Sequence, residues 1–136
     1  MPHPTLGPIH QVVEVSYRYP VAFTSDLFSA DNALLAQTCQ RSVPGRIPRV
    51  LVVVDEGVSN AYPELIDDIE AWFGDHAASL DLVRSPLLVP GGEQVKNDHQ
   101  HVDLIREAVN DFGIDRHSYV VVVGGGAVLD MAGYAA

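Results

Sequence analysis

The sequence is poor in the residues that bind proteins to membranes or nucleic acids or hold them in disulfide frameworks. Its one cysteine, Cys39, cannot form a disulfide within the chain and fits a reducing compartment. Eight Lys and Arg residues stand against eighteen Asp and Glu residues, which gives a formal net charge of −10. Because nucleic acids and anionic membranes are bound through clustered cations, we expect neither as a partner.

Long apolar runs are also missing. The longest, around residues 120–123, is far shorter than the ~20 residues of a transmembrane helix. The N-terminus has no positively charged segment followed by an apolar core, so the sequence predicts no signal peptide. These features favour a soluble cytoplasmic protein.

The length of 136 residues suffices for one domain with a hydrophobic core. Residues 1–10 carry three prolines and predict an irregular arm, which leaves residues 11–136 for the domain. Apolar and polar residues alternate from Gln11 to Tyr17, as in a half-buried strand, and residues 21–24 can form a short partner strand. We therefore expect a β-strand pair at the N-terminus.

The rest of the chain alternates between strand and helix patterns. Asp31 is a plausible N-cap for a helix that reaches Cys39, and another helix is expected from about Pro63, with Gly74 as its stop. The further segments are buried strands at 50–54 and 119–123, candidate strand pieces at 80–83 and 87–89, and helices at 98–112 and from Ala127. This order predicts an α/β fold with a doubly wound, mostly parallel sheet, whose ligands bind at the carboxyl ends of the strands.

Three glycines, residues 124–126, follow the last buried strand directly. Without side chains there, backbone N–H groups can approach a diphosphate, and the N-terminus of the next helix adds a partial positive charge. Asp130 in the first turn of that helix suits the helix dipole, and it can equally accept a bond from a ribose or an amide. A tight strand-to-helix turn without a ligand remains an open alternative.

Acidic residues follow two other strands. Glu93 and Lys96 are three residues apart, so in a helical turn both side chains point into the same space and can contact a ribose or phosphate. Taken alone, this pair is more simply explained as a cap and ion pair for the following helix. Asp55 ends the first buried strand, where an acid is either a ribose partner or a helix N-terminal acid.

The histidines do not predict a metal site. His99 and His101 are two residues apart and would lie on different faces of a helix, and no Cys/His cluster has the spacing of a zinc site. We therefore expect no metal ligands among these residues.

Taken together, the Asp55 strand end, residues 90–96 (PGGEQVK) and residues 124–133 (GGGAVLDMAG) resemble 3-dehydroquinate synthase and the wider sugar phosphate cyclase family. The resemblance covers about residues 11–136 and corresponds to the amino-terminal, Rossmann-like NAD domain of such enzymes. It implies NAD as the cofactor. The implied cofactor contacts are Asp55, Glu93, Lys96, Gly125, Gly126, Ala127 and Asp130.

The resemblance also implies a carbon–oxygen lyase reaction in the full-length protein. In the family, NAD transiently oxidises a hydroxyl of a small sugar phosphate, phosphate is eliminated, the ketone is reduced again and an aldol reaction closes a carbocycle. The divalent metal, usually zinc, and the residues that grip the substrate belong to a helical carboxy-terminal domain. We expect that domain to be absent from this chain, which would end in mid-helix, lack catalytic residues and be inactive alone, and we expect the full-length protein to be a homodimer.

Some details differ from the dehydroquinate pattern. Leu129 stands where dehydroquinate synthases usually have glycine, and Glu56-Gly57 replaces a more usual polar pair. The segments 18–21, 93–98 and 115–119 are closer to cyclases acting on sedoheptulose 7-phosphate or to Ebo-type cluster proteins. The substrate therefore stays open at this point.

Two alternatives remain. Iron-dependent alcohol and glycerol dehydrogenases share a Gly-Gly-Gly-x-x-x-Asp turn, but they usually have Ser where this chain has Ala127, and they lack the Gly-Glu-Gln-x-Lys segment. A free-standing α/β binding module would form a closed monomeric domain without affinity for NAD.

Overall fold

The computed structural model describes residues 7–40, 42–92 and 99–136. At its centre lies strand β1 (Arg49–Asp55), to which every other strand pairs in parallel. Strand β4 (Tyr119–Val123) runs along one edge of β1, with Val50 opposite Tyr119. Strands β2 (Asp81–Leu82) and β3 (Leu87–Val89) follow one another along the opposite edge, where they pair with the beginning and the end of β1.

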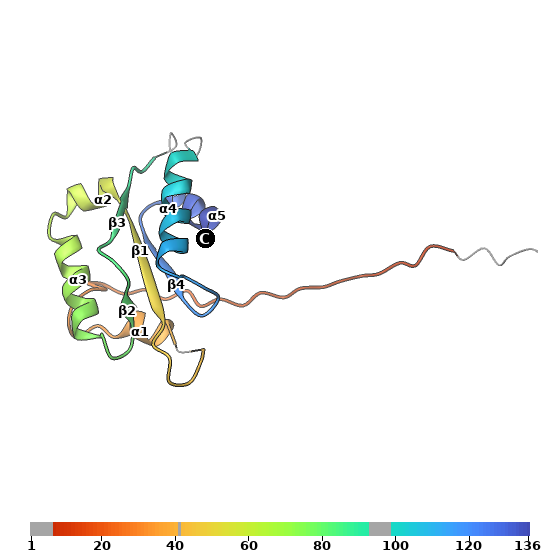
Figure 1. Cartoon of the computed structure of the whole chain (residues 1–136), viewed down its shortest axis with the longest axis horizontal. Helices are drawn as coiled ribbons and strands as arrows, with labels where there is room; N and C mark the ends of the chain where they lie inside the picture. The colour runs from red at the N-terminus through yellow and green to blue at the C-terminus, as the bar shows by residue number, and fades with distance from the viewer. Residues whose placement is uncertain (1–6, 41, 93–98) are drawn as a thin grey trace, which may run out of the picture.

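Helices cover both faces of this sheet, as Figure 1 shows on either side of β1. Helices α1 (Leu34–Thr38) and α3 (Leu65–Asp75) pack with Val50, Val52 and Val54. Helices α4 (His99–Asp111) and α5 (Gly126–Ala135) pack with Leu51 and Val53 on the other face. The short helix α2 (Glu56–Ala61) follows β1 directly.

The sequence explains this three-layer arrangement. The side chains of residues 50–54 alternate between the two faces and are all apolar, so both faces of β1 are buried, and each of these residues is 0% exposed. Helix α4 buries Val102, Ile105 and Ala108, which are spaced three residues apart and therefore lie along one side. The chain thus winds helices onto both faces of a parallel sheet, which confirms the expected doubly wound α/β class.

Trp72 fixes the layer of α1 and α3. The indole is 1% exposed, and its Nε1 donates to the carbonyl oxygen of Asn32 at 2.9 Å. The ring of His76 stacks on it at 3.9 Å, and the rings of Phe28 and Phe73 meet it edge-on. The segment before α1 is therefore held against α3.

Several helix ends differ from the sequence-based expectations. Asp31 is not the N-cap of the first helix: Ala33 occupies that position, and the side chain of Asn32 accepts a hydrogen bond from the Leu34 N–H at 3.1 Å. The Asp31 carboxylate instead accepts from the Ser29 hydroxyl. Gly74 does not stop α3, which continues to Asp75.

The expected N-terminal strand pair is wrong. Residues 7–24 form no strand, and every one of them is exposed. Val13, Tyr17 and Phe23 are 82%, 84% and 95% exposed. The alternating pattern is present, but a strand also needs a neighbour for its hydrogen bonds and an apolar surface for its inner face, and an isolated two-stranded pair is marginal in water.

Within the part of the chain that the structure describes, no helix has the length and apolar character needed to cross a membrane.

Candidate functional site

Three strand ends meet at Asp55. This residue ends β1, Gly91 follows β3 after one residue, and Gly124 follows β4 directly. A Cβ at Gly91 would overlap the Asp55 carboxylate, and one at Gly124 would lie 2.8 Å from the Asp55 Cβ. Because only glycine leaves room for this approach, the two glycines allow the strand ends to close around one carboxylate.

The orientation of the Asp55 side chain is fixed by helix α2. Asp55 is the N-cap of this helix, and its Oδ1 accepts a hydrogen bond from the Gly57 N–H at 2.7 Å. The helix N-terminal interpretation of this acid is therefore confirmed. An ionised carboxylate has about four acceptor positions, so the cap leaves capacity for a ligand hydroxyl.

Gly125 and Gly126 form an open approach to the start of helix α5. Gly125 is the N-cap residue, no side chain caps the helix there, and nothing lies within 4 Å of where a Cβ would be at either glycine. Both residues are exposed. The first N–H groups of a helix have no partner within the helix, so this end can donate to an anionic group that reaches it.

Two of the other predicted site residues, Ala127 and Asp130, lie in the helix that follows this turn. Ala127 is partly buried in the first turn of α5, and Asp130 is exposed one turn after Gly126, on the same side of the helix. Glu93 and Lys96 lie outside the described residues. The described loop before them passes Asp55 at Gly91, and the next residue, Gly92, has a left-handed φ of +96° that favours glycine.

The described part of this edge fits a nucleotide diphosphate. It offers the open N-terminus of a ten-residue helix, a backbone free of side chains at two successive positions, and a carboxylate at the neighbouring strand end. Among residues 7–40, 42–92 and 99–136, no group of three or more His, Cys, Asp or Glu side chains is arranged to hold a metal ion.

A pocket of about 610 Å³ lies elsewhere, against α3. Phe28, Tyr62 and Trp72 contribute to its wall, and none of its lining residues belongs to a strand end. Cys39 is buried in the same layer, where burial raises the pKa of the thiol and so disfavours the reactive thiolate. We assign no catalytic role to this region.

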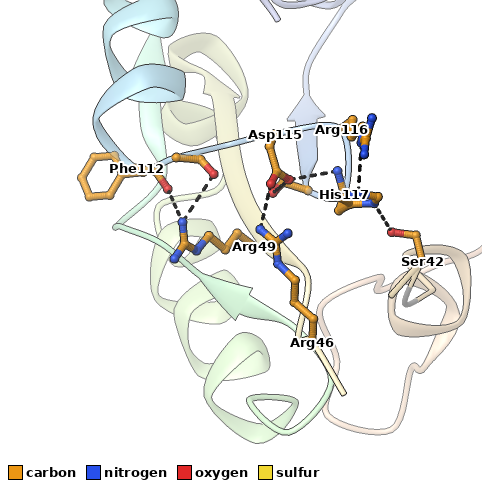
Figure 2. A network of polar contacts seen from close by, with 9 residues as sticks. Ser42, Arg46, Arg49, Phe112, Asp115, Arg116 and His117 are labelled. Atoms are coloured by element: carbon orange, nitrogen blue, oxygen red, sulfur yellow. Dashed lines mark hydrogen bonds and ion pairs between the residues drawn. The ribbon is translucent and has the colours of Figure 1, made fainter. Parts of the chain in front are cut away.

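A polar network that the sequence analysis missed joins the amino ends of β1 and β4 (Figure 2). The carboxylate of Asp115 accepts from the guanidinium of Arg46 at 2.8 Å, and from the His117 N–H and the Ser118 hydroxyl at 2.9 Å each. Together these donors, Arg46 first, hold the pKa of the Asp115 carboxyl well below its usual range. An aspartate followed two and three residues later by His and Ser is a turn pattern that could have revealed it.

Ser42 and His117 in this network are not a nucleophile and its base. The Ser42 Oγ lies 2.9 Å from the His117 Nδ1, and the Arg116 Nε donates to the His117 Nε2 at 3.1 Å. Because Nε2 accepts that bond, the ring proton of neutral His117 is on Nδ1 and points at Ser42, so the ring cannot take the hydroxyl proton. The network instead ties the loop before β1 to the start of β4.

The fold and the glycine turn define a Rossmann-like α/β domain whose open edge carries a helix N-terminus suited to phosphate. Residues 86–136 match the sequence model described as 3-dehydroquinate synthase N-terminal. That segment contains the loop after β3, helix α4, strand β4 and the glycine turn.

Curated relatives agree with this match. The chain is 35% identical over 120 residues to a 3-dehydroquinate synthase of Geotalea uraniireducens. The aligned region covers 87% of this chain and 29% of that protein. It is 32% identical over 118 residues to a 3-dehydroquinate synthase of Shewanella sp. strain MR-4. The aligned region covers 87% of this chain and 28% of that protein. The chain is similar to the amino-terminal part of 3-dehydroquinate synthases, and it spans less than a third of the length of these relatives.

Proposed function

We propose that this chain is the NAD-binding half of a 3-dehydroquinate synthase-like sugar phosphate cyclase. The single observation that carries the proposal is the closure of three strand ends around Asp55, next to the open glycine start of α5. In doubly wound sheets, ligands bind outside the carboxyl ends of the strands, where the winding changes direction. Here that change lies between β1 and β4, which end at Asp55 and Val123.

The proposed roles follow from what each group can donate or accept. The N–H groups at the start of α5 donate to the diphosphate, and Gly125 and Gly126 keep side chains out of its path. Asp55 accepts from a ribose hydroxyl while its Oδ1 stays bonded to Gly57. Asp130, one turn into α5, is a further acceptor at the same edge, and Glu93 and Lys96 are proposed contacts from the sequence alone.

NAD, when bound, supplies a reversible acceptor for the hydride of a substrate hydroxyl. The residues of this chain bind and orient it, and we assign no catalytic residue to them. The divalent metal implied by the family is likewise assigned to no residue here. For the longer protein we propose a lyase acting on a small sugar phosphate, either the seven-carbon sugar phosphate that cyclises to dehydroquinate or sedoheptulose 7-phosphate.

Isothermal titration calorimetry of the chain with NAD and with parts of the NAD molecule tests the binding proposal. NAD and ADP-ribose both carry the diphosphate, whereas adenosine and nicotinamide riboside do not. If α5 binds the diphosphate, NAD and ADP-ribose bind with similar affinity, and the two nucleosides bind at least about tenfold more weakly, as expected for the loss of charged hydrogen bonds.

The results distinguish the proposed site from the alternatives. Equal binding of adenosine and NAD would place the recognition away from the glycine turn. No heat with NAD or ADP-ribose at any concentration would favour a module without affinity for the dinucleotide. For the longer protein, turnover of a heptulose phosphate without net change in NADH separates a cyclase from an alcohol dehydrogenase.

A further inference from the structure

The pocket against α3, called the α3 groove from here on, lies on the face of the sheet opposite α4 and α5 (Figure 1). Its volume is about 610 Å³. One wall is the segment before α1, at residues 26–30, and the other is formed by α3 and the residues just before it, between residues 62 and 75. Both walls belong to one layer of the domain, so the groove does not depend on an open edge of the sheet, and it is separate from the glycine turn.

The α3 groove is lined by acids of one sign. Asp26 stands on one wall, and three more acids stand on the other, namely Glu64, Asp68 and Asp75. No Lys, Arg or His is among the described residues that line the groove. Within the described parts of the chain, none of the four carboxylates has an ion-pair partner. The charge of the groove is therefore complementary to a cation.

These carboxylates are spread along the groove and do not converge on one point. Asp68 and Asp75 stand two turns apart on α3, which places them on one side of the helix and roughly 10 Å apart along its axis. Glu64 precedes Asp68 by one more turn. Among the described residues, no three His, Cys, Asp or Glu side chains are arranged to hold a metal ion. A compact inorganic ion would thus leave most of the charge unmatched, whereas an extended cation with several charges can meet it.

Apolar and aromatic side chains lie between the charges. Trp72 is 1% exposed and forms the bottom of the groove, and the ring of Phe28 meets it edge-on with the ring centroids 6.2 Å apart. Tyr62 is 67% exposed, and Leu65 and Ala71 complete this surface. Alkyl groups pack on such a surface, and ammonium groups are attracted to aromatic rings. The occupant therefore combines an alkyl chain with separated positive charges.

We propose that the α3 groove binds a linear aliphatic polyamine, a flexible alkyl chain that carries protonated amines at intervals. Two ammonium groups pair with Asp68 and Asp75, and the methylene groups between them lie over Ala71 and Trp72. Asp26 meets the same cation from the opposite wall. A second copy of the chain does not suit the groove, because each copy carries a net charge of −10. This proposal does not rest on the dinucleotide site.

Titration of the 136-residue chain with spermidine at constant ionic strength tests the proposal. Trp72 is the single tryptophan and lines the groove, so its fluorescence should change as the site fills. Spermidine should saturate one site. Butylamine, which has one ammonium group on a short alkyl chain, should bind at least about tenfold more weakly, because it can meet only one of the separated carboxylates. Equal binding of the two amines, or no saturation by spermidine, would overturn the proposal.

Asp68→Asn and Asp67→Asn form a matched pair of variants. Both acids are exposed in the first turn of α3, so each change removes the same charge and the same interaction with the helix dipole, but only Asp68 lines the groove. Asp68→Asn and Asp75→Asn should each weaken spermidine binding at least about threefold, and Asp67→Asn should change it by less than about 1.5-fold. Circular dichroism should show the same folded domain in all three variants.

Two results of this comparison would contradict the proposal. Unchanged affinity in both Asp68→Asn and Asp75→Asn would remove the groove as the site. A loss in Asp67→Asn as large as that in Asp68→Asn would mean that spermidine is attracted to the acidic chain as a whole.

Discussion

The carboxylate of Asp55 lies so close to the α-carbon of Gly91 that any side chain at residue 91 would overlap it. These residues stand at the ends of neighbouring strands, β1 and β3. The Asp55 side chain is short and is bonded to the Gly57 N–H, so it cannot swing away without losing the cap of α2. The two strand ends and the start of α2 therefore form one rigid unit at the proposed ligand edge.

Gly91→Ala should destabilise the fold by about 1–3 kcal/mol, because the new methyl group must displace the Asp55 carboxylate. Chemical denaturation measures this loss. The strain needs both side chains, so Asp55→Ala should relieve part of it, and the double variant should be more stable than the sum of the single changes predicts by at least about 0.5 kcal/mol. If the changes in the free energy of unfolding were strictly additive, the two side chains would not be in steric conflict.

Asp55→Asn should separate the structural role of this residue from its charge. Asparagine caps helices about as well as aspartate, so the free energy of unfolding should change by less than about 0.5 kcal/mol, whereas Asp55→Ala should cost about 1 kcal/mol. If Asp55 accepts from a ribose, the asparagine variant should still bind NAD more weakly, by about tenfold. Calorimetric titration with unchanged affinity would remove Asp55 from the proposed site.

The Asp115 network predicts a pH dependence of stability. The pKa of the Asp115 carboxyl is lowered in the folded protein, first by the Arg46 guanidinium, so the ionised form stabilises the fold. This contribution is complete above the unfolded pKa of about 3.9 and is lost as the pH falls below it toward the lowered folded value.

The comparison of wild type with Asp115→Asn across pH measures this effect. The difference in the free energy of unfolding should be constant above about pH 5 and shrink progressively below about pH 4. Arg46→Gln removes the first donor and should make the shrinkage begin at the same pH but end sooner. A difference independent of pH down to the acid transition would mean that Asp115 is not preferentially ionised in the fold.

Ile105 tests the packing of α4 on the sheet. Its side chain is 0% exposed in the cluster formed with Leu51, Val128 and Met131, so Ile105→Ala should cost about 2–5 kcal/mol. The neighbouring Leu104 is 39% exposed, and Leu104→Ala should cost much less, below about 1 kcal/mol. The single tryptophan, Trp72, lies in the opposite layer and reports unfolding by its fluorescence in both variants.

The sequence was informative where periodicity and burial agree. The apolar runs at 50–54 and 119–123 gave two adjacent parallel strands, because a strand buried on both faces needs apolar residues at every position. The glycines after β4 indicated close backbone approach, and the structure shows Gly124 packed against Asp55. Gly91 after β3, which the sequence did not single out, is packed against the same side chain. What these patterns left undetermined was the partner of each glycine, which only the strand order decides.

Other features depend on contacts that no local pattern contains. Helix α2 includes Gly57, Ser59 and Asn60, which are weak helix formers, so its six residues were not expected. Residues 11–17 have the alternation of a strand, but they pair with no strand among the described residues. The bond between Arg46 and Asp115 joins residues 69 positions apart and follows from the register of β1 and β4.

The affinity of NAD for Gly125→Val, compared with Gly133→Val, tests the central claim most directly. Both glycines belong to the α5 segment, and a Cβ at either position meets nothing within 4 Å, so both variants should fold as the wild type does. Valine at Gly125 would stand in the path of the diphosphate, whereas valine at Gly133 lies near the far end of the helix. We predict that Gly125→Val weakens NAD binding at least about tenfold and that Gly133→Val leaves it unchanged. Equal affinity in the two folded variants would contradict the assignment of the glycine turn as the dinucleotide site.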